Sequence, residues 1–159
     1  LPLWKDICAQ RAEAGALLGP MEAWLLLRGM RTLPLRIERM CATAQSVAEA
    51  MHAHPLVETV WYPGLPDHPG HALAQKQMCG GAGYLMSLLV KGGADDALGV
   101  AGRLHLIHRS TSLGCTETLV EHRATIEPQS GIPGNLLRLS IGLEDPGDLI
   151  ADLDQALRG

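Results

Sequence analysis

A long helical stripe is the feature of this sequence that most restricts its fold. From Pro34 onward, apolar residues recur at steps of three and four over about five helical turns, which places them on one face of a helix. The stripe consists of Ile37, Met40, Ala44, Val47, Ala48 and Met51. A helix with one apolar face has to bury that face against another layer of secondary structure, which the rest of the chain must supply.

Short segments typical of strands alternate with further helices. The segments predicted as strands are residues 57–62, 84–90, 104–108 and 136–142. The other segments predicted as helices are residues 3–14, 20–27, 70–78, 94–102 and the stretch after Asp145. We expect Gly29 to interrupt the second helix, and residues 84–90 to be buried on both faces of the sheet. This alternation predicts an α/β fold, an α+β sandwich in which helices cover a short sheet.

Composition excludes several classes of protein. The chain has 159 residues, of which 47% are hydrophobic and 19% charged, and this excludes disorder for most of its length. Its uninterrupted apolar runs are a few residues long, whereas a bilayer-spanning helix needs about 20, so we predict a soluble protein with no membrane partner. A formal net charge of -4 without a basic cluster also argues against nucleic acid as a partner.

The cysteines and histidines carry no clear site pattern. Four separated cysteines predict reduced thiols and a cytoplasmic location. The histidines at 52, 54, 68 and 71 lack neighbouring thiolates or carboxylates, so we interpret them as surface or capping residues and predict no metal site. Cys115 and His122 admit a thiol nucleophile with its base, although we favour an inert, packed thiol because nothing in the sequence fixes their geometry.

Arg138 is the most informative polar residue, because it interrupts the apolar segment 136–141. A guanidinium in such a strand is costly unless an anion pairs with it. Side chains alternate along a strand, so Arg138 and Ser140 share one face while Leu137 and Leu139 share the other. Two partners remain open on physical grounds, an internal carboxylate or the carboxylate of a bound substrate, for which the planar guanidinium is well suited.

Four ordered segments resemble one enzyme family. They are residues 23–33, residues 60–65, the Ser112-Leu113-Gly114 turn with residues 117–119, and residues 137–145. Together they are similar to the C-terminal part of the pyridoxal-phosphate (PLP) enzymes of cysteine and methionine metabolism, the cystathionine γ-synthase and γ-lyase group of transsulfuration. The resemblance implies the small C-terminal domain of a fold-type I PLP-dependent transferase.

The resemblance also implies roles for particular residues. Arg138 corresponds to the arginine that binds the α-carboxylate of an amino-acid substrate, and Ser112 belongs to the turn beside substrate and cofactor. We therefore expect a substrate-binding group of Arg138, Ser112, Leu113 and Thr111. The family's C–S bond elimination or replacement uses the cofactor as an electron sink and a lysine to move protons. Thr111 stands where many γ-family members have glutamate, so the reaction type and the substrate stay open.

The family's cofactor lysine has no counterpart here. Lys5, Lys76 and Lys91 lie outside the expected motif, so we expect no catalytic residue in this chain and no activity of the chain alone. We interpret it as a C-terminal fragment, with residues 1–33 as linker helices that pack on a missing N-terminal PLP domain and residues 34–159 as the small domain. The resemblance implies a tetrameric homo-oligomer for the parent enzyme.

Two further alternatives remain at this stage. The chain is also compatible with a non-catalytic interaction or assembly module that kept the fold and lost the chemistry. Residues 122–133 depart from the family pattern, which indicates either a shortened active-site loop or a neutral surface deletion. Whether the chain is a fragment or a module, the region 25–33 and the glycine loops are expected to lack their usual covering surface, which predicts apolar exposure and self-association.

Overall fold

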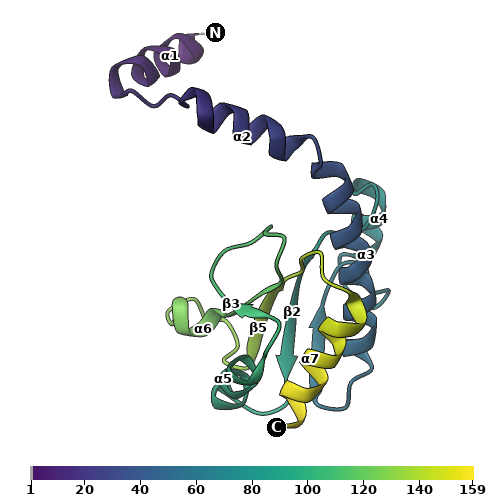
Figure 1. Ribbon diagram of the computed structural model, residues 1–159. Helices are drawn as coiled ribbons and strands as arrows, with labels where there is room; N and C mark the ends of the chain where they lie inside the picture. The colour runs from purple at the N-terminus through teal and green to yellow at the C-terminus, as the bar shows by residue number, and fades with distance from the viewer. Residues whose placement is uncertain (1) are drawn as a thin grey trace. The chain divides into compact units, whose positions relative to one another are not determined.

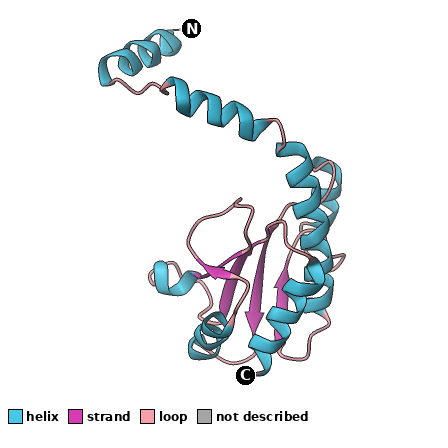
Figure 2. Cartoon of the chain, in the orientation of Figure 1, coloured by secondary structure: helices cyan, strands magenta, loops and turns pink. Residues whose placement is uncertain are grey.

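The computed structural model describes residues 2–159 of the chain. The chain divides into two compact units, with the division between Pro34 and Leu35. The first unit carries two helices, α1 (Pro2–Ala14) and α2 (Pro20–Met30). The second contains the sheet and the helices that pack on it (Figures 1 and 2). The mixed architecture of helices and a five-stranded sheet confirms the predicted fold class.

The helices of the first unit bury none of their described residues. Proline occupies the first turn of α2, where its missing N–H costs nothing. The prediction that Gly29 interrupts α2 is wrong, since the helix continues to Met30. A single glycine costs a helix only about 1 kcal/mol, and the leucines before it are strong helix formers.

The sheet of the second unit has five strands in the order β1-β2-β5-β4-β3. Their bounds are β1 Val57–Trp61, β2 Leu85–Val90, β3 His108–Arg109, β4 Leu119–His122 and β5 Leu136–Ser140. Neighbouring strands run antiparallel except for β3 and β4, which are parallel. β5 lies at the centre of the sheet, so its side chains have neighbours on both sides.

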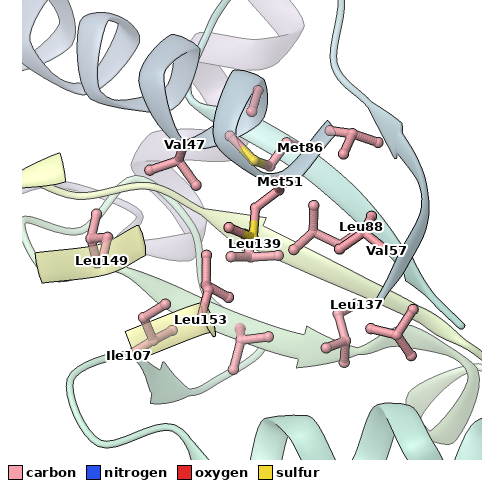
Figure 3. Packing of buried hydrophobic residues seen from close by; sticks show 14 of the residues in the cluster. Val47, Met51, Val57, Met86, Leu88, Ile107, Leu137, Leu139, Leu149 and Leu153 are labelled. Carbon is pink, nitrogen blue, oxygen red and sulfur yellow. The ribbon is translucent and has the colours of Figure 1, made fainter. Parts of the chain in front are cut away.

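Two long helices cover one face of this sheet. They are α3 (Leu33–His52) and α7 (Pro146–Arg158), and their apolar stripes meet the side chains of the central strands (Figure 3). The predicted stripe of α3 is buried from Met40 onward, and Ile37 is half-buried. Asp145 caps α7 by accepting a hydrogen bond of 2.8 Å from the backbone N–H of Gly147. The shared core therefore lies between these helices and the sheet.

Three shorter helices complete the second unit. They are α4 (His71–Gln77), α5 (Ala94–Arg103) and α6 (Arg123–Ile126). α5 packs against α7 and buries Ala97, Val100 and Ala101 in the core. Among residues 2–159, no helix combines the length and the apolar character required to cross a bilayer.

The predicted strand 104–108 is largely wrong, because only His108 and Arg109 pair as β3. The Asp152 carboxylate on α7 accepts hydrogen bonds of 2.9, 2.9 and 3.0 Å from the backbone N–H groups of residues 105, 106 and 107. Burial alone raises the pKa of Asp152, but these backbone hydrogen bonds outweigh it and lower the pKa. Amides that donate to a carboxylate cannot donate to a neighbouring strand, so the chain bends here.

Other details also differ from the sequence prediction. β4 was not predicted as a strand, and Leu85 in β2 is exposed, so β2 is not buried on both faces along its whole length. His54 is buried rather than on the surface: its Nε2 lies 3.0 Å from an Asp154 carboxylate oxygen, and its Nδ1 accepts from the Leu56 N–H at 3.2 Å. It anchors the end of α3 to α7.

Candidate substrate-carboxylate site

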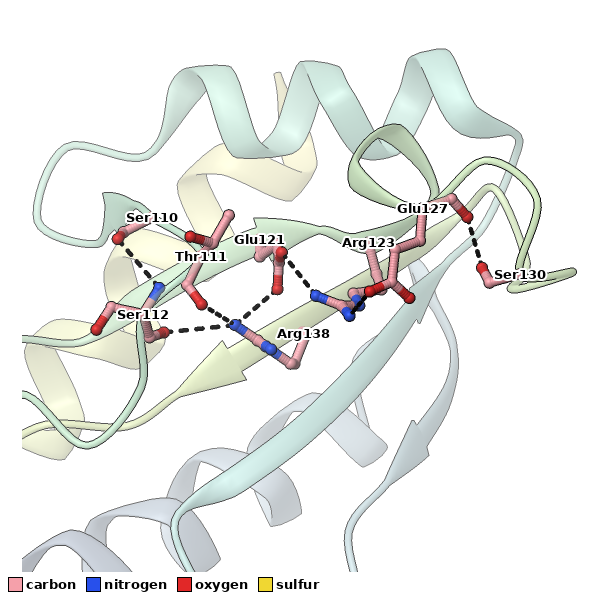
Figure 4. Close-up of polar contacts among 8 residues, drawn as sticks. All are labelled: Ser110, Thr111, Ser112, Glu121, Arg123, Glu127, Ser130 and Arg138. Carbon is pink, nitrogen blue, oxygen red and sulfur yellow. Dashed lines mark hydrogen bonds and ion pairs between the residues drawn. The ribbon is translucent and has the colours of Figure 1, made fainter. Parts of the chain in front are cut away.

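β5 places Arg138 on the face of the sheet opposite the core. Leu137 and Leu139 are fully buried among the core residues, and side-chain alternation directs Arg138 to the other face, as predicted. The Arg138 side chain is 21% exposed. In Figure 4 its guanidinium lies between Glu121 and the backbone of Thr111 and Ser112.

The turn at residues 111–114 is held directly against β5. Nη2 of Arg138 donates to the carbonyl oxygen of Thr111 at 2.8 Å and to that of Ser112 at 3.4 Å. The Ser140 hydroxyl oxygen accepts from the Gly114 N–H at 3.0 Å. The structure therefore brings together Arg138, Thr111 and Ser112, whereas Leu113 is half exposed and makes no polar contact with the arginine.

Gly114 allows the turn to come this close. Its φ of +76° lies in the left-handed region, and a Cβ atom there would lie 3.2 Å from the Tyr84 hydroxyl oxygen. A side chain at this position would strain the backbone and press on Tyr84. Local sterics therefore favour glycine over any other residue at position 114 of the predicted turn.

The far end of the same loop is fixed by a second set of hydrogen bonds. The Glu144 carboxylate accepts from the Thr118 N–H at 2.6 Å and from the Thr118 hydroxyl at 2.7 Å. The Thr118 hydroxyl oxygen in turn accepts from the Gly142 N–H at 2.8 Å. These contacts join residues 117–119 to residues 142–144 and so close the loop that carries Thr111 and Ser112.

Glu121 is the partner of Arg138 that sequence analysis missed. It stands directly opposite Arg138 in the β4–β5 register, and its Oε2 lies 2.6 Å from Nη2 of the arginine. Of the two partners left open by the sequence, an internal carboxylate is therefore present. Nε of Arg138 is buried without a hydrogen-bond partner, and Nη1 makes no polar contact with a described residue. No signal in the sequence identifies Glu121, because the pairing depends on strand register.

Cys115 and His122 do not form a nucleophile and base pair. Nδ1 of His122 lies 2.6 Å from the Thr125 hydroxyl oxygen, and its Nε2 lies 2.5 Å from the Gly134 carbonyl oxygen. Both ring nitrogens are therefore engaged locally, and the residue ties α6 to the start of β5. Cys115 Sγ lies 3.8 Å from the Ser112 hydroxyl oxygen, and all four cysteines are free thiols.

Comparisons with known proteins identify the family. The family model described as Cys/Met metabolism PLP-dependent enzyme matches residues 3–158. This chain belongs to that family. An L-methionine gamma-lyase of Fusobacterium nucleatum subsp. polymorphum is 43% identical over 152 residues, which cover 90% of this chain and 38% of that protein. A cystathionine gamma-synthase of Mycobacterium tuberculosis (strain ATCC 25618 / H37Rv) is 42% identical over 150 residues, which cover 91% of this chain and 38% of that protein.

Solved structures agree with this assignment. The crystal structure of an apo methionine gamma lyase from Micromonospora echinospora matches with a TM-score of 0.88 and 40% identity, covering 98% of this chain and 42% of that chain. The family resemblance seen in the sequence and the predicted fold are thereby confirmed. The chain spans 38% of the length of the curated relatives it matches.

The described residues alone do not fit the family's cofactor. A lysine has to lie at the site to hold PLP covalently, but Lys5 is in α1, Lys76 is in α4, and Lys91 follows β2. All three lysines are exposed, and none belongs to the strands or the turn around Arg138. None of the three lysines is therefore placed to hold PLP beside Arg138.

Proposed function

We propose that this chain is the C-terminal part of a PLP-dependent enzyme that breaks or forms C–S bonds of amino acids. Support comes from the family, from relatives named as methionine gamma-lyases and cystathionine gamma-synthases, and from the partial coverage of those relatives. Bound PLP supplies an electron sink at the substrate's α-carbon. In this proposal the cofactor and its lysine are held by polypeptide beyond these 159 residues.

The role proposed for this chain is to bind and orient the substrate carboxylate through Arg138. One observation carries the proposal: Nη2 is held by the Thr111 and Ser112 carbonyls, while Nε and Nη1 have no hydrogen-bond partner among the described residues. Nε and Nη1 point to different sides of the planar guanidinium, so a substrate carboxylate would accept a single charge-assisted hydrogen bond, from Nη1. Fixing it limits rotation of the substrate and so selects which bond at the α-carbon reacts. Leu113 completes the proposed group as an exposed apolar side chain.

The proposed domain organisation follows from the same fragment hypothesis. Residues 1–33 form linker helices that pack on the missing N-terminal domain, and residues 34–159 form the small domain. The absence of buried residues in α1 and α2 supports a covering partner for them. We further propose a homo-oligomer for the whole enzyme, and a cytoplasmic location that fits the four free thiols.

Kinetics of the full-length gene product test the role of Arg138. Arg138→Ala should raise KM for the amino-acid substrate and lower kcat/KM by about 30-fold, because a charge-assisted hydrogen bond contributes about 2 kcal/mol. Arg158→Ala is the control, since Arg158 is an exposed arginine of α7 whose ion-pair partner is Asp154. Unchanged kinetics in Arg138→Ala would remove this residue from the site.

The dependence on a missing domain has its own test. The 159-residue chain mixed with PLP should show no C–S cleavage, and borohydride should trap only non-specific adducts on exposed amines. An adduct on one of its three lysines together with C–S cleavage would contradict the fragment hypothesis. The intact mass of the native gene product provides an independent check.

A non-catalytic assembly module is the second candidate. The observation that favours it is the ion pair with Glu121, which already supplies Arg138 with an anion. A native gene product that begins at this segment would support the module. A longer product whose activity depends on Arg138 would exclude it.

A further inference from the structure

We propose that Glu121 is a positioning residue that orients Arg138 toward the substrate carboxylate, and that Arg123 holds Glu121 in place. This inference rests on the proposed function of Arg138. Glu121 forms ion pairs with both Arg123 and Arg138, so the three charged side chains contact one another in a row (Figure 4).

Burial makes the position of Glu121 significant. Its side chain is only 2% exposed, and a buried carboxylate is strongly unfavourable unless cations or donors compensate for its lost hydration. Two guanidinium groups provide that compensation, one on each oxygen. Oε2 lies 2.6 Å from Nη2 of Arg138, and Oε1 accepts a hydrogen bond of 3.1 Å from Nη1 of Arg123.

The contact between Glu121 and Arg138 is made through Nη2, and it leaves Nη1 without a partner among the described residues. The hydrogen bonds of Nη2 go to the Thr111 and Ser112 carbonyls, so the carboxylate acts on this nitrogen as an ion-pair partner. The two carbonyl oxygens and the carboxylate oxygen all gather at a single nitrogen of the guanidinium. Because the group is planar and rigid, fixing Nη2 also fixes the direction in which Nη1 points.

Arg123 extends this control to α6. Its Nη1 contacts Glu121, and its Nη2 contacts Glu127, which stands four residues further on. Burial lowers the pKa of Arg123, but the hydrogen bonds to these two carboxylates outweigh it and raise the pKa. The Arg123 side chain is 26% exposed, so most of it is packed against the protein, and Arg123→Gln keeps a polar side chain at this position. Residues that never touch the substrate thereby influence the orientation of Arg138.

The test compares Glu121→Gln and Arg123→Gln in the full-length gene product. Glu121→Gln keeps the shape and removes the charge, and we expect KM for the amino-acid substrate to rise about tenfold while kcat changes less than about twofold. Arg123→Gln should raise KM about threefold. Arg158→Gln, a change at an exposed arginine of α7 whose ion-pair partner is Asp154, should leave KM unchanged.

A double-mutant cycle separates positioning from a general structural role. In an Arg138→Ala background, Glu121→Gln should cause no further rise in KM. The KM of the corresponding amine, which lacks the α-carboxylate, should respond to neither change. An equal effect of Glu121→Gln in both backgrounds, or on both substrates, would overturn the proposal.

The outcomes also separate this inference from the proposed function. If Arg138→Ala leaves KM unchanged, the proposed role of Arg138 fails. If Arg138→Ala raises KM but Glu121→Gln and Arg123→Gln do not, only the positioning role fails. Thermal unfolding of each variant identifies a folding defect, and Arg123→Gln keeps the test decisive if Glu121→Gln does not fold.

Discussion

The helices α2 and α3 follow each other in the chain but differ in how their apolar residues are used. α3 has one apolar stripe and buries it against the sheet, whereas α2 has apolar residues all round and buries none of them. The exposed apolar residues of α2 are Met21, Trp24, Leu25, Leu26, Leu27 and Met30. A helix that is apolar on every side is normally surrounded by other polypeptide. The comparison shows that α3 finds its packing partner within this chain, apart from Leu33 and Leu35 at its start, whereas α2 leaves its apolar side chains exposed.

The largest effect should come from truncating matched leucines in the two units. Leu139→Ala in the fully buried centre of β5 should lower the free energy of unfolding by about 2 to 5 kcal/mol, because it leaves a cavity. Leu25→Ala in α2 should change it by less than about 0.5 kcal/mol. Urea unfolding measures both. Equal losses would show that α2 contributes to the same cooperative core.

A smaller effect should follow from removing the carboxylate that fixes residues 105–107. Asp152→Asn should lower the free energy of unfolding by about 2 kcal/mol, because a neutral amide accepts hydrogen bonds from the three backbone N–H groups more weakly than the carboxylate does. Asp148→Asn is the control, since Asp148 is an exposed carboxylate on the same helix. A loss no larger than the control's would show that the bend does not depend on the charge.

The same pair of variants predicts a dependence on pH. The pKa of Asp152 is lowered from 3.8 in the folded state, so its contribution is present above that pH and is lost as the pH falls below it. The free energy of unfolding should therefore fall less steeply with decreasing pH in Asp152→Asn than in the wild-type chain. Asp148→Asn should leave this pH dependence nearly unchanged. Urea unfolding between pH 5 and about 2 measures the difference.

The smallest expected effect concerns self-association of the isolated chain through α2. Leu25→Lys should weaken association about tenfold, because it places a charge in the exposed apolar surface. Leu73→Lys is the matched control, since Leu73 is an equally exposed leucine of α4 in the second unit. Sedimentation across a concentration series measures both variants. A wild-type chain that stays monomeric throughout would contradict the prediction.

Local patterns predicted most of the fold. The spacing of apolar residues identified α3, and Asp145 with Pro146 identified the start of α7, since both signals depend on near neighbours in the chain. The segment 104–108 was misassigned because Asp152, about 45 residues away, takes the amides that a strand would use. Contacts across such a separation leave no mark on local periodicity.

At the candidate site, too, some features follow from local sequence and others only from the tertiary structure. The sequence by itself determined that Arg138 interrupts an apolar strand and needs an anion, because the cost of burying a charge and the alternation of strand side chains are local properties. Only the tertiary structure decided that Glu121 is that anion and that Thr111 and Ser112 hold the same nitrogen. Pairing between β4 and β5 sets these neighbours, and strand register arises from the packing of the whole sheet rather than from either strand alone.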